Sequence, residues 1–259
     1  MSPAKPGAPR HTERELMVIA ASREVRDGEQ VFVGMRLPLI AFAFAKRTHA
    51  PRAIGLFENG IVRDQPAPET LMTMSDTPNV SGAVWCAGTL EVMGLLQQGL
   101  VDLGFIGGAE IDRHGNLNTS CIGDWRRPKV RLPGSGGGGD LASLAGRFVV
   151  IMPQQKHRFR ERVDYITSPG FGDGAGWRER VGLPGGGPSA VITTLGVYRF
   201  DETGDMILVS YHPGQSVESI RAETGWELRV APDVRQTPTP RPDELTVVRA
   251  CDPGGVWTR

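Results

Sequence analysis

Strand-like runs that alternate with helix-like runs are the feature that most constrains the fold of this chain. Residues 29–35 (EQVFVGM) have the pattern of a strand that breaks at Gly34, and residues 52–57 (RAIGLF) form the next strand-like run. Between them, Pro38 suits the first turn of a helix that residues 39–49 (LIAFAFAKRTH) continue. A strand, a helix and a second strand over about 30 residues match a right-handed parallel crossover unit.

The same alternation recurs further along the chain. Residues 89–99 (TLEVMGLLQQG) and 140–146 (DLASLAG) have helical patterns, and each precedes a strand-like run, residues 101–108 (VDLGFIGG) and 147–153 (RFVVIMP). This order predicts an α/β fold with an open, mostly parallel sheet and helices on both faces. In such sheets, ligands bind beyond the carboxyl ends of the strands.

The C-terminal part has a different pattern. Residues 190–214 predict two strands joined by a turn-rich DETGD segment, which is a C-terminal hairpin. Residues 216–228 predict a short helix with Ser216 as the N-cap and Gly225 at the C′ position. Residues 235–244, which are rich in proline, are expected to run extended over the surface.

The N-terminus is polar and proline-rich, so residues 1–11 are predicted to be a disordered tail. Thr12 as the N-cap and Glu15 at the capping-box position predict that a helix opens there. Glycine-rich segments later in the chain are too short to act as linkers, so residues 12–259 are expected to form a single α/β domain.

Charge and hydropathy limit the possible partners and compartments. The chain has 29 basic and 29 acidic residues, so no broad attraction to nucleic acid or to an anionic membrane is expected. We expect no membrane span, because the apolar runs are short, and no signal peptide, because the N-terminus lacks an apolar core. These features predict a cytoplasmic protein.

Cysteine and histidine are sparse. The three cysteines are scattered without a CxxC pair, and the five histidines show no metal-ligand spacing, so we predict no metal site. Cys86 follows Trp85 directly and is expected to be a buried thiol rather than a nucleophile.

Glu58 is an acid placed at the end of a strand-like run. The turn pair Asn59-Gly60 follows it, so Glu58 is either a solvated turn residue or a reagent. A carboxylate acts as a nucleophile when it is partly desolvated and has an oxyanion stabiliser nearby. The tip of a strand above a glycine loop would provide both.

A glycine-rich loop is present at residues 133–140 (PGSGGGGD), where five of the six residues from 134 to 139 are glycine. Such a loop either is a flexible linker or lets main-chain N–H groups approach an anion closely. No Gly-Lys-Ser/Thr follows, so it is not a Walker A loop, and the preceding KVRLP is a poor strand for a dinucleotide fingerprint.

Several segments taken together resemble the B (β) chain of family I CoA-transferases, and most closely the glutaconate CoA-transferase type. The resemblance extends from about Glu13 to Asp252. The segments that carry it are VGMRLPLIAFAFAKRTHAP, ENG, GFIGGAEIDRHGNLNTSCIGDW, PKVRLPGSGGGGDLA, DYITSPGFGDGAGWRERVGLPGGGP and HPGQSVESIRAETGWEL.

The resemblance implies a mechanism and a partner. The family's nucleophile falls on Glu58, and its oxyanion-hole loop falls on residues 134–139, where Gly136 and Gly137 are favoured. Neighbouring residues are expected to bind the substrate or coenzyme A: Asn59, Gly60, Gly134, Ser135 and Gly138. Coenzyme A would enter as a substrate, with no other cofactor. A homologous A (α) subunit would complete the active site in a heterotetramer or larger assembly, with residues 125–131 and 168–188 as candidate contact surfaces.

One residue departs from the family pattern. Glu110 stands in GGAEID where the family commonly has glutamine. Its carboxylate is structural, alters substrate choice as part of the substrate or coenzyme A site, or marks a relative whose reaction has changed. The resemblance therefore implies CoA transfer to a dicarboxylic or branched acid. An acyl-CoA decarboxylase or hydrolase on the same scaffold is the alternative, and a ligand-sensing subunit is the non-enzymatic one.

Overall fold

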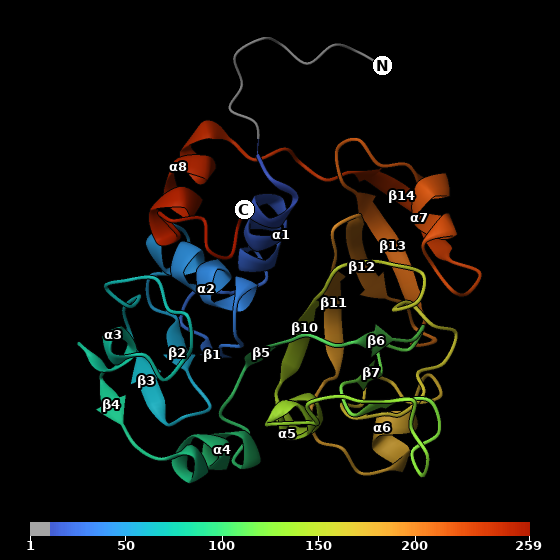
Figure 1. Cartoon of the computed structure of the whole chain (residues 1–259), viewed down its shortest axis with the longest axis horizontal. Coiled ribbons are helices and arrows are strands. Elements are labelled where there is room, and N and C mark those ends of the chain that lie inside the picture. The colour runs from blue at the N-terminus through green and yellow to red at the C-terminus, as the bar shows by residue number, and fades with distance from the viewer. Residues whose placement is uncertain (1–10) are drawn as a thin grey trace.

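The computed structural model describes residues 11–259, which form a sheet with helices on both faces (Figure 1). The predicted tail therefore lies outside the described residues, apart from His11. The helices of the described part are α1 (Glu13–Ser22), α2 (Leu37–Arg47), α3 (Thr77–Val80), α4 (Thr89–Gln97), α5 (Gly138–Leu144), α6 (Trp177–Arg180), α7 (Val217–Ala222) and α8 (Pro242–Cys251).

One large sheet organises the described chain. In spatial order its strands are β14 (Arg229–Gln236), β13 (Met206–Tyr211), β12 (Gly196–Phe200), β11 (Pro188–Ile192), β10 (Arg147–Ile151), β5 (Leu103–Ile106), β1 (Gln30–Phe32), β2 (Ile54–Leu56), β3 (Ile61–Arg63) and β4 (Trp85–Cys86). Two small hairpins pair β6 (Glu110–Ile111) with β7 (Leu117–Asn118) and β8 (Cys121–Ile122) with β9 (Val130–Arg131).

The five central strands, from β11 to β2, are parallel, whereas antiparallel pairs flank them on both sides. Central parallel strands are buried on both faces, which explains their nearly continuous apolar runs. The prediction of an open, mostly parallel α/β sheet is thus confirmed. The crossover from β1 through α2 to the parallel strand β2 is the unit that the sequence predicted.

Each face of the sheet has its own core. Successive strand residues point to opposite faces, and β1 shows the result. Val31 is buried with Ile19 and Phe44 beneath α1 and α2, whereas Phe32 is buried on the side of α4 and α5 with Leu141. In Figure 1, α1, α2 and α8 lie together, away from α4 and α5.

Several local predictions are confirmed at the residue level. Thr12 caps α1 and forms a reciprocal capping box with Glu15, and Pro38 lies in the first turn of α2. Ser216 caps α7 as expected. Gly225, however, is not the C′ residue, because the helix ends at Ala222 with Glu223 as its C-cap.

The C-terminal region differs from the prediction. The predicted hairpin is present as β12 and β13, joined at residues 201–205, but its first half also contains the end of β11, because the chain turns back at residues 193–195. The segment at 235–244 is not simply extended. It includes the end of β14, which pairs with β13, and the first turn of α8. Pro242 at the start of α8, with acids at 243 and 244, is a helix-start signal that sequence reasoning missed.

Candidate active site

Glu58 lies in the tight turn between β2 and β3, at the carboxyl end of a central strand. The amide N–H of Gly60 donates to the carbonyl oxygen of Phe57 at 2.9 Å and closes the turn. Gly60 has a φ of +102°, and a Cβ added there would lie 2.2 Å from the carbonyl oxygen of Ala87. Only glycine fits both conditions, so the turn fixes the main chain beneath the partly buried Glu58 side chain.

The glycine loop meets Glu58 directly, although 79 residues separate them in sequence. The amide N–H of Gly137 donates to Glu58 Oε1 at 2.9 Å. A Cβ added to Gly137 would lie 3.1 Å from Glu58 Cδ, and Gly136 adopts a positive φ of +47°. The loop is therefore an ordered approach to the carboxylate rather than a flexible linker, and Glu58 is not a fully solvated turn residue.

The other residues predicted near the site have contacts of their own. The amide of Gly138 donates to the carbonyl oxygen of Ser135 at 2.9 Å. The amide of Gly134 donates to the carbonyl oxygen of Thr119 at 2.8 Å. The side-chain amide of Asn59 donates to the carbonyl of Met74 at 2.8 Å. Ser135 and Gly138 line the cleft that contains Glu58, whereas Asn59, Gly60 and Gly134 are not among its lining residues.

A cleft opens over Glu58 at the carboxyl ends of β1 and β5. Its wall is otherwise uncharged, and the residues lining it are Phe32, Val33, Gly34, Met35, Glu58, Met74, Phe105, Ile106, Gly107, Ser135, Gly137, Gly138 and Leu141. An acid among apolar groups and main-chain amides is partly desolvated, which increases the reactivity of its carboxylate toward a carbonyl carbon.

Glu110 occupies a different environment. The residue is 2% exposed, and its Oε2 accepts hydrogen bonds from Asn118 Nδ2 at 2.7 Å and from the amide of Asp164 at 3.2 Å. Arg160 lies 3.7 Å from its Oε1. Because Glu110 does not line the Glu58 cleft, its geometry favours the structural role among those that the sequence left open.

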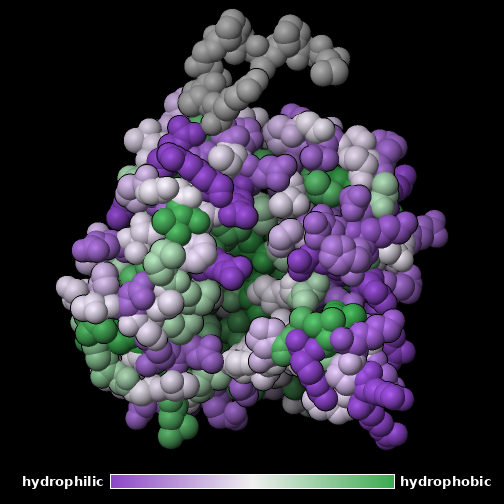
Figure 2. Space-filling model, viewed as in Figure 1, coloured by the Kyte–Doolittle hydropathy of each residue, from purple (hydrophilic) through white to green (hydrophobic). Residues whose placement is uncertain are grey.

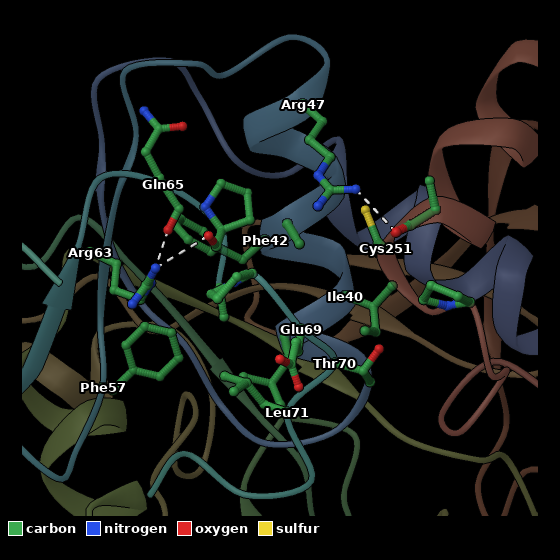
Figure 3. Close-up of a pocket in the computed structure, with 17 residues that line it drawn as sticks. Ile40, Phe42, Arg47, Phe57, Arg63, Gln65, Glu69, Thr70, Leu71 and Cys251 are labelled. Atoms are coloured by element: carbon green, nitrogen blue, oxygen red, sulfur yellow. Dashed lines mark hydrogen bonds between the residues drawn. The ribbon is translucent and has the colours of Figure 1, made fainter. Parts of the chain in front are cut away.

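A second hollow lies between α2, α8 and residues 65–71 (Figure 3). The guanidinium group of Arg63 donates to the carbonyls of Gln65 and Pro66, and Arg47 donates to that of Ala250. Because both guanidinium groups are hydrogen-bonded to main-chain carbonyls, we interpret this hollow as part of the scaffold and not as a ligand site. Sequence reasoning did not single out Arg63, which is buried and anchors the segment after β3.

Three further predictions concern thiols, metals and membranes. Cys86 is exposed on the edge strand β4, so the expectation of a buried thiol is wrong; an edge strand has no neighbour to cover it. Between residues 11 and 259, no three His, Cys, Asp or Glu side chains group in a way that could hold a metal ion. Over the same range, every helix is too short or too polar to cross a membrane.

Comparison with known proteins places this geometry in a family. The B-type chain of the 3-oxoadipate CoA-transferase of Pseudomonas knackmussii is 36% identical over 244 residues, covering 93% of this chain and 94% of the relative. The B-type chain of the glutaconate CoA-transferase of Acidaminococcus fermentans is 36% identical over 252 residues, covering 94% of each chain.

Solved structures agree with these sequence relatives. The crystal structure of glutaconate coenzyme A-transferase from Acidaminococcus fermentans superposes with a TM-score of 0.90 at 33% identity, covering 96% of this chain and 98% of the other. The decarboxylase AibA/AibB superposes with a TM-score of 0.83 at 26% identity and the same coverage. Residues 14–223 match the Coenzyme A transferase family, and the chain therefore belongs to the coenzyme A transferase family.

Proposed function

We propose that this chain is the B (β) component of a two-component CoA-transferase that moves coenzyme A between an acyl-CoA and a free carboxylic acid. Glu58 is the nucleophile, and a covalent glutamyl-CoA thioester is the intermediate. The observation that carries the proposal is the 2.9 Å hydrogen bond from the Gly137 amide to Glu58 Oε1 inside a cleft at the carboxyl ends of the strands.

The proposed reaction has two half-reactions, which transfer coenzyme A first to Glu58 and then to a second acid. The Glu58 carboxylate attacks the thioester carbonyl, and the CoA thiolate leaves as a mixed anhydride forms. The thiolate then attacks the glutamyl carbonyl of the anhydride, which gives the glutamyl-CoA thioester and releases the first acid as its carboxylate. A second carboxylate reverses both steps and departs as the new acyl-CoA, so the kinetics are expected to be ping-pong.

Gly137 has a defined role in this sequence. When the thiolate attacks the glutamyl carbonyl, negative charge develops on the side-chain oxygen of Glu58 itself. In the free protein, the Gly137 amide already lies 2.9 Å from Oε1. This is within the range at which a main-chain donor stabilises an oxyanion. The same contact orients the carboxylate before the first attack.

A homologous A (α) subunit is proposed to complete the site. The relatives are named as one component of a two-component enzyme, and the Glu58 side chain remains partly exposed in this chain alone. Trp125 is a candidate contact, because it is 50% exposed although it stacks on Tyr165 at 4.7 Å and lies under Arg131. We propose a cytoplasmic heterotetramer or larger assembly, without a resident cofactor, that acts on a dicarboxylic or branched acid.

The test uses this chain co-expressed with its α partner. Glu58→Ala is expected to abolish exchange of label between an acyl-CoA and free acid, whereas Glu202→Ala, a change in an exposed turn, leaves the rate unchanged. Exchange at the normal rate by Glu58→Ala would show that another group is the nucleophile.

Decarboxylation is the second candidate, and the similarity to the decarboxylase AibA/AibB favours it. Release of CO₂ from an acyl-CoA without any acceptor acid would support this alternative. Strict dependence of product formation on an acceptor acid would support the transferase.

A further inference from the structure

A larger cleft adjoins the cleft over Glu58. Both are lined by Gly34, Met35, Phe105, Ile106 and Gly107, so they share a wall. The hollow in the middle of Figure 2 has hydrophobic residues at its floor and hydrophilic residues around its rim. A molecule that reacts at Glu58 can therefore extend into the larger cleft.

The charged residues that line the larger cleft are all cationic: Arg14, Arg36 and Arg158. None of its lining residues is acidic. The floor contains buried apolar side chains, among them Met17 and Met152. Cations at the rim of an apolar cleft favour a ligand with a carbon chain and an anionic end.

Two of these arginines have guanidinium groups available to a ligand. Arg36 lies over the ring of Trp257, 5.9 Å from its centroid, and forms no ion pair within residues 11–259. Arg158 donates through Nε to Gln155 Oε1 at 2.9 Å, and no described acid pairs with its terminal nitrogens. Arg14, in contrast, donates to the carbonyls of Trp257 and Arg259.

The backbone of Arg36 is also unusual. Arg36 is the non-glycine residue with a positive φ in the described chain, at +68°. With a ψ of −118°, this backbone lies outside the left-handed helical region, and such a conformation costs an L-residue about 1–3 kcal/mol. Glycine would adopt this backbone without strain, yet the chain has arginine here. An arginine at a strained position is consistent with a function for its guanidinium group.

We propose that Arg36 and Arg158 form a subsite for the distal carboxylate of a dicarboxylic acyl group whose thioester carbonyl lies at Glu58. The inference rests on the proposed function, and it identifies the residues that select the acyl group. The apolar floor receives the carbon chain between the two ends. The phosphates of coenzyme A would gain nothing from that floor, so the acyl carboxylate fits this subsite better.

The experiment compares two donors of equal chain length, glutaryl-CoA and valeryl-CoA, with the complete complex. Arg36→Gln is expected to lower kcat/KM for glutaryl-CoA by about 10- to 100-fold, the range for loss of a charge-assisted hydrogen bond. The value for valeryl-CoA should change by less than about 3-fold. Arg158→Gln should also lower kcat/KM for glutaryl-CoA selectively, and Arg52→Gln, at an exposed ion pair with Asp27, is the matched control.

Three results would overturn the subsite. An equal loss of kcat/KM for both donors in Arg36→Gln would mean that Arg36 binds coenzyme A or supports the fold. No loss for either donor would show that Arg36 does not contact the substrate. Normal glutaryl-CoA kinetics in Arg158→Gln would show that Arg158 is not part of the subsite. If Arg36→Gln does not fold, Arg36→Gly removes the guanidinium group and accepts the positive φ.

A binding measurement separates this proposal from the proposed function. Calorimetric titration of the complex with glutarate and with valerate needs no turnover. Glutarate binding that weakens about 10-fold or more in Arg36→Gln, with valerate binding unchanged, supports the subsite even if no CoA transfer occurs. Equal effects on both acids would contradict it, even in an active transferase.

Discussion

Replacing Gly137 by alanine isolates the contact between the glycine loop and the nucleophile. Gly137 has a φ of −77° and a ψ of 2°, which alanine adopts without strain. The added methyl carbon would lie 3.1 Å from Glu58 Cδ, 3.2 Å from Oε1 and 3.3 Å from the terminal carbon of Met93. These contacts are a few tenths of an ångström too close, so the Glu58 carboxylate has to move while the fold is unaffected.

The size of the effect follows from the hydrogen bond that this movement disturbs. A hydrogen bond to a charged group contributes about 1.5–3 kcal/mol, which corresponds to about 10- to 150-fold in rate. We therefore expect Gly137→Ala to lower kcat/KM for CoA transfer by about 10- to 100-fold. Its free energy of unfolding should change by less than about 1 kcal/mol.

Gly28→Ala is the matched control. Gly28 has a φ of +87° with nothing within 4 Å of an added Cβ, and it precedes β1 at the end of the sheet opposite Glu58. The change should cost about 1 kcal/mol of stability and leave the transfer rate as it is. Urea unfolding and steady-state kinetics on both variants are the assays. A Gly137→Ala enzyme with a normal rate, or one that loses activity only because it unfolds, would refute the reasoning.

The remaining predictions concern stability and the second acid. Burial lowers the pKa of His212 to about 4, from 6.5 when exposed, so the unfolded chain binds the proton first. The stability contributed by neutral His212 is therefore complete above about pH 6.5 and falls by about 3 kcal/mol toward pH 4; urea midpoints across this range should show the slope, and His212→Gln should reduce it. Arg63→Met should cost about 3 kcal/mol, measured by urea unfolding, because the carbonyls of Asn79 and Ser81 lose their donor at 2.6 and 2.8 Å. Glu110→Gln should leave the transfer rate within about 3-fold if the acid is structural, and a change in substrate preference would contradict that role.

The central fold was predictable because each signal is local. The capping box at Thr12, the proline that opens α2 and the apolar runs of the central strands all depend on residues close in sequence. Helix α8 also has a local signal in Pro242 and the acids that follow it, but Pro238 and Pro240 just before it give the segment the composition of an extended loop. Strand β14 is polar, and it was missed because its pairing with β13 is a tertiary contact.

The candidate site was only partly predictable. The sequence places Glu58 beside a turn pair but does not determine whether its carboxylate is exposed to solvent. Only the folded chain shows that the Gly137 amide lies against Glu58. Buried arginines were also beyond sequence reasoning, because arginine is usually exposed. Arg178 is an example: it is 4% exposed, and it donates to the carbonyls of Gly170, Gly185 and Ala142. It thereby ties the glycine-rich loops to α5.

The most direct test of the account is chemical trapping of the intermediate on Glu58. The complex is incubated with an acyl-CoA in the absence of acceptor acid, treated with borohydride and digested for peptide mass spectrometry. We predict that coenzyme A is found linked to the peptide containing Glu58 in a sample that omits borohydride, that borohydride releases coenzyme A and reduces this residue to an alcohol in the treated sample, and that both products disappear in Glu58→Gln. A reduced residue elsewhere in the chain, or CoA transfer at full rate with Glu58 unmodified, would contradict the account.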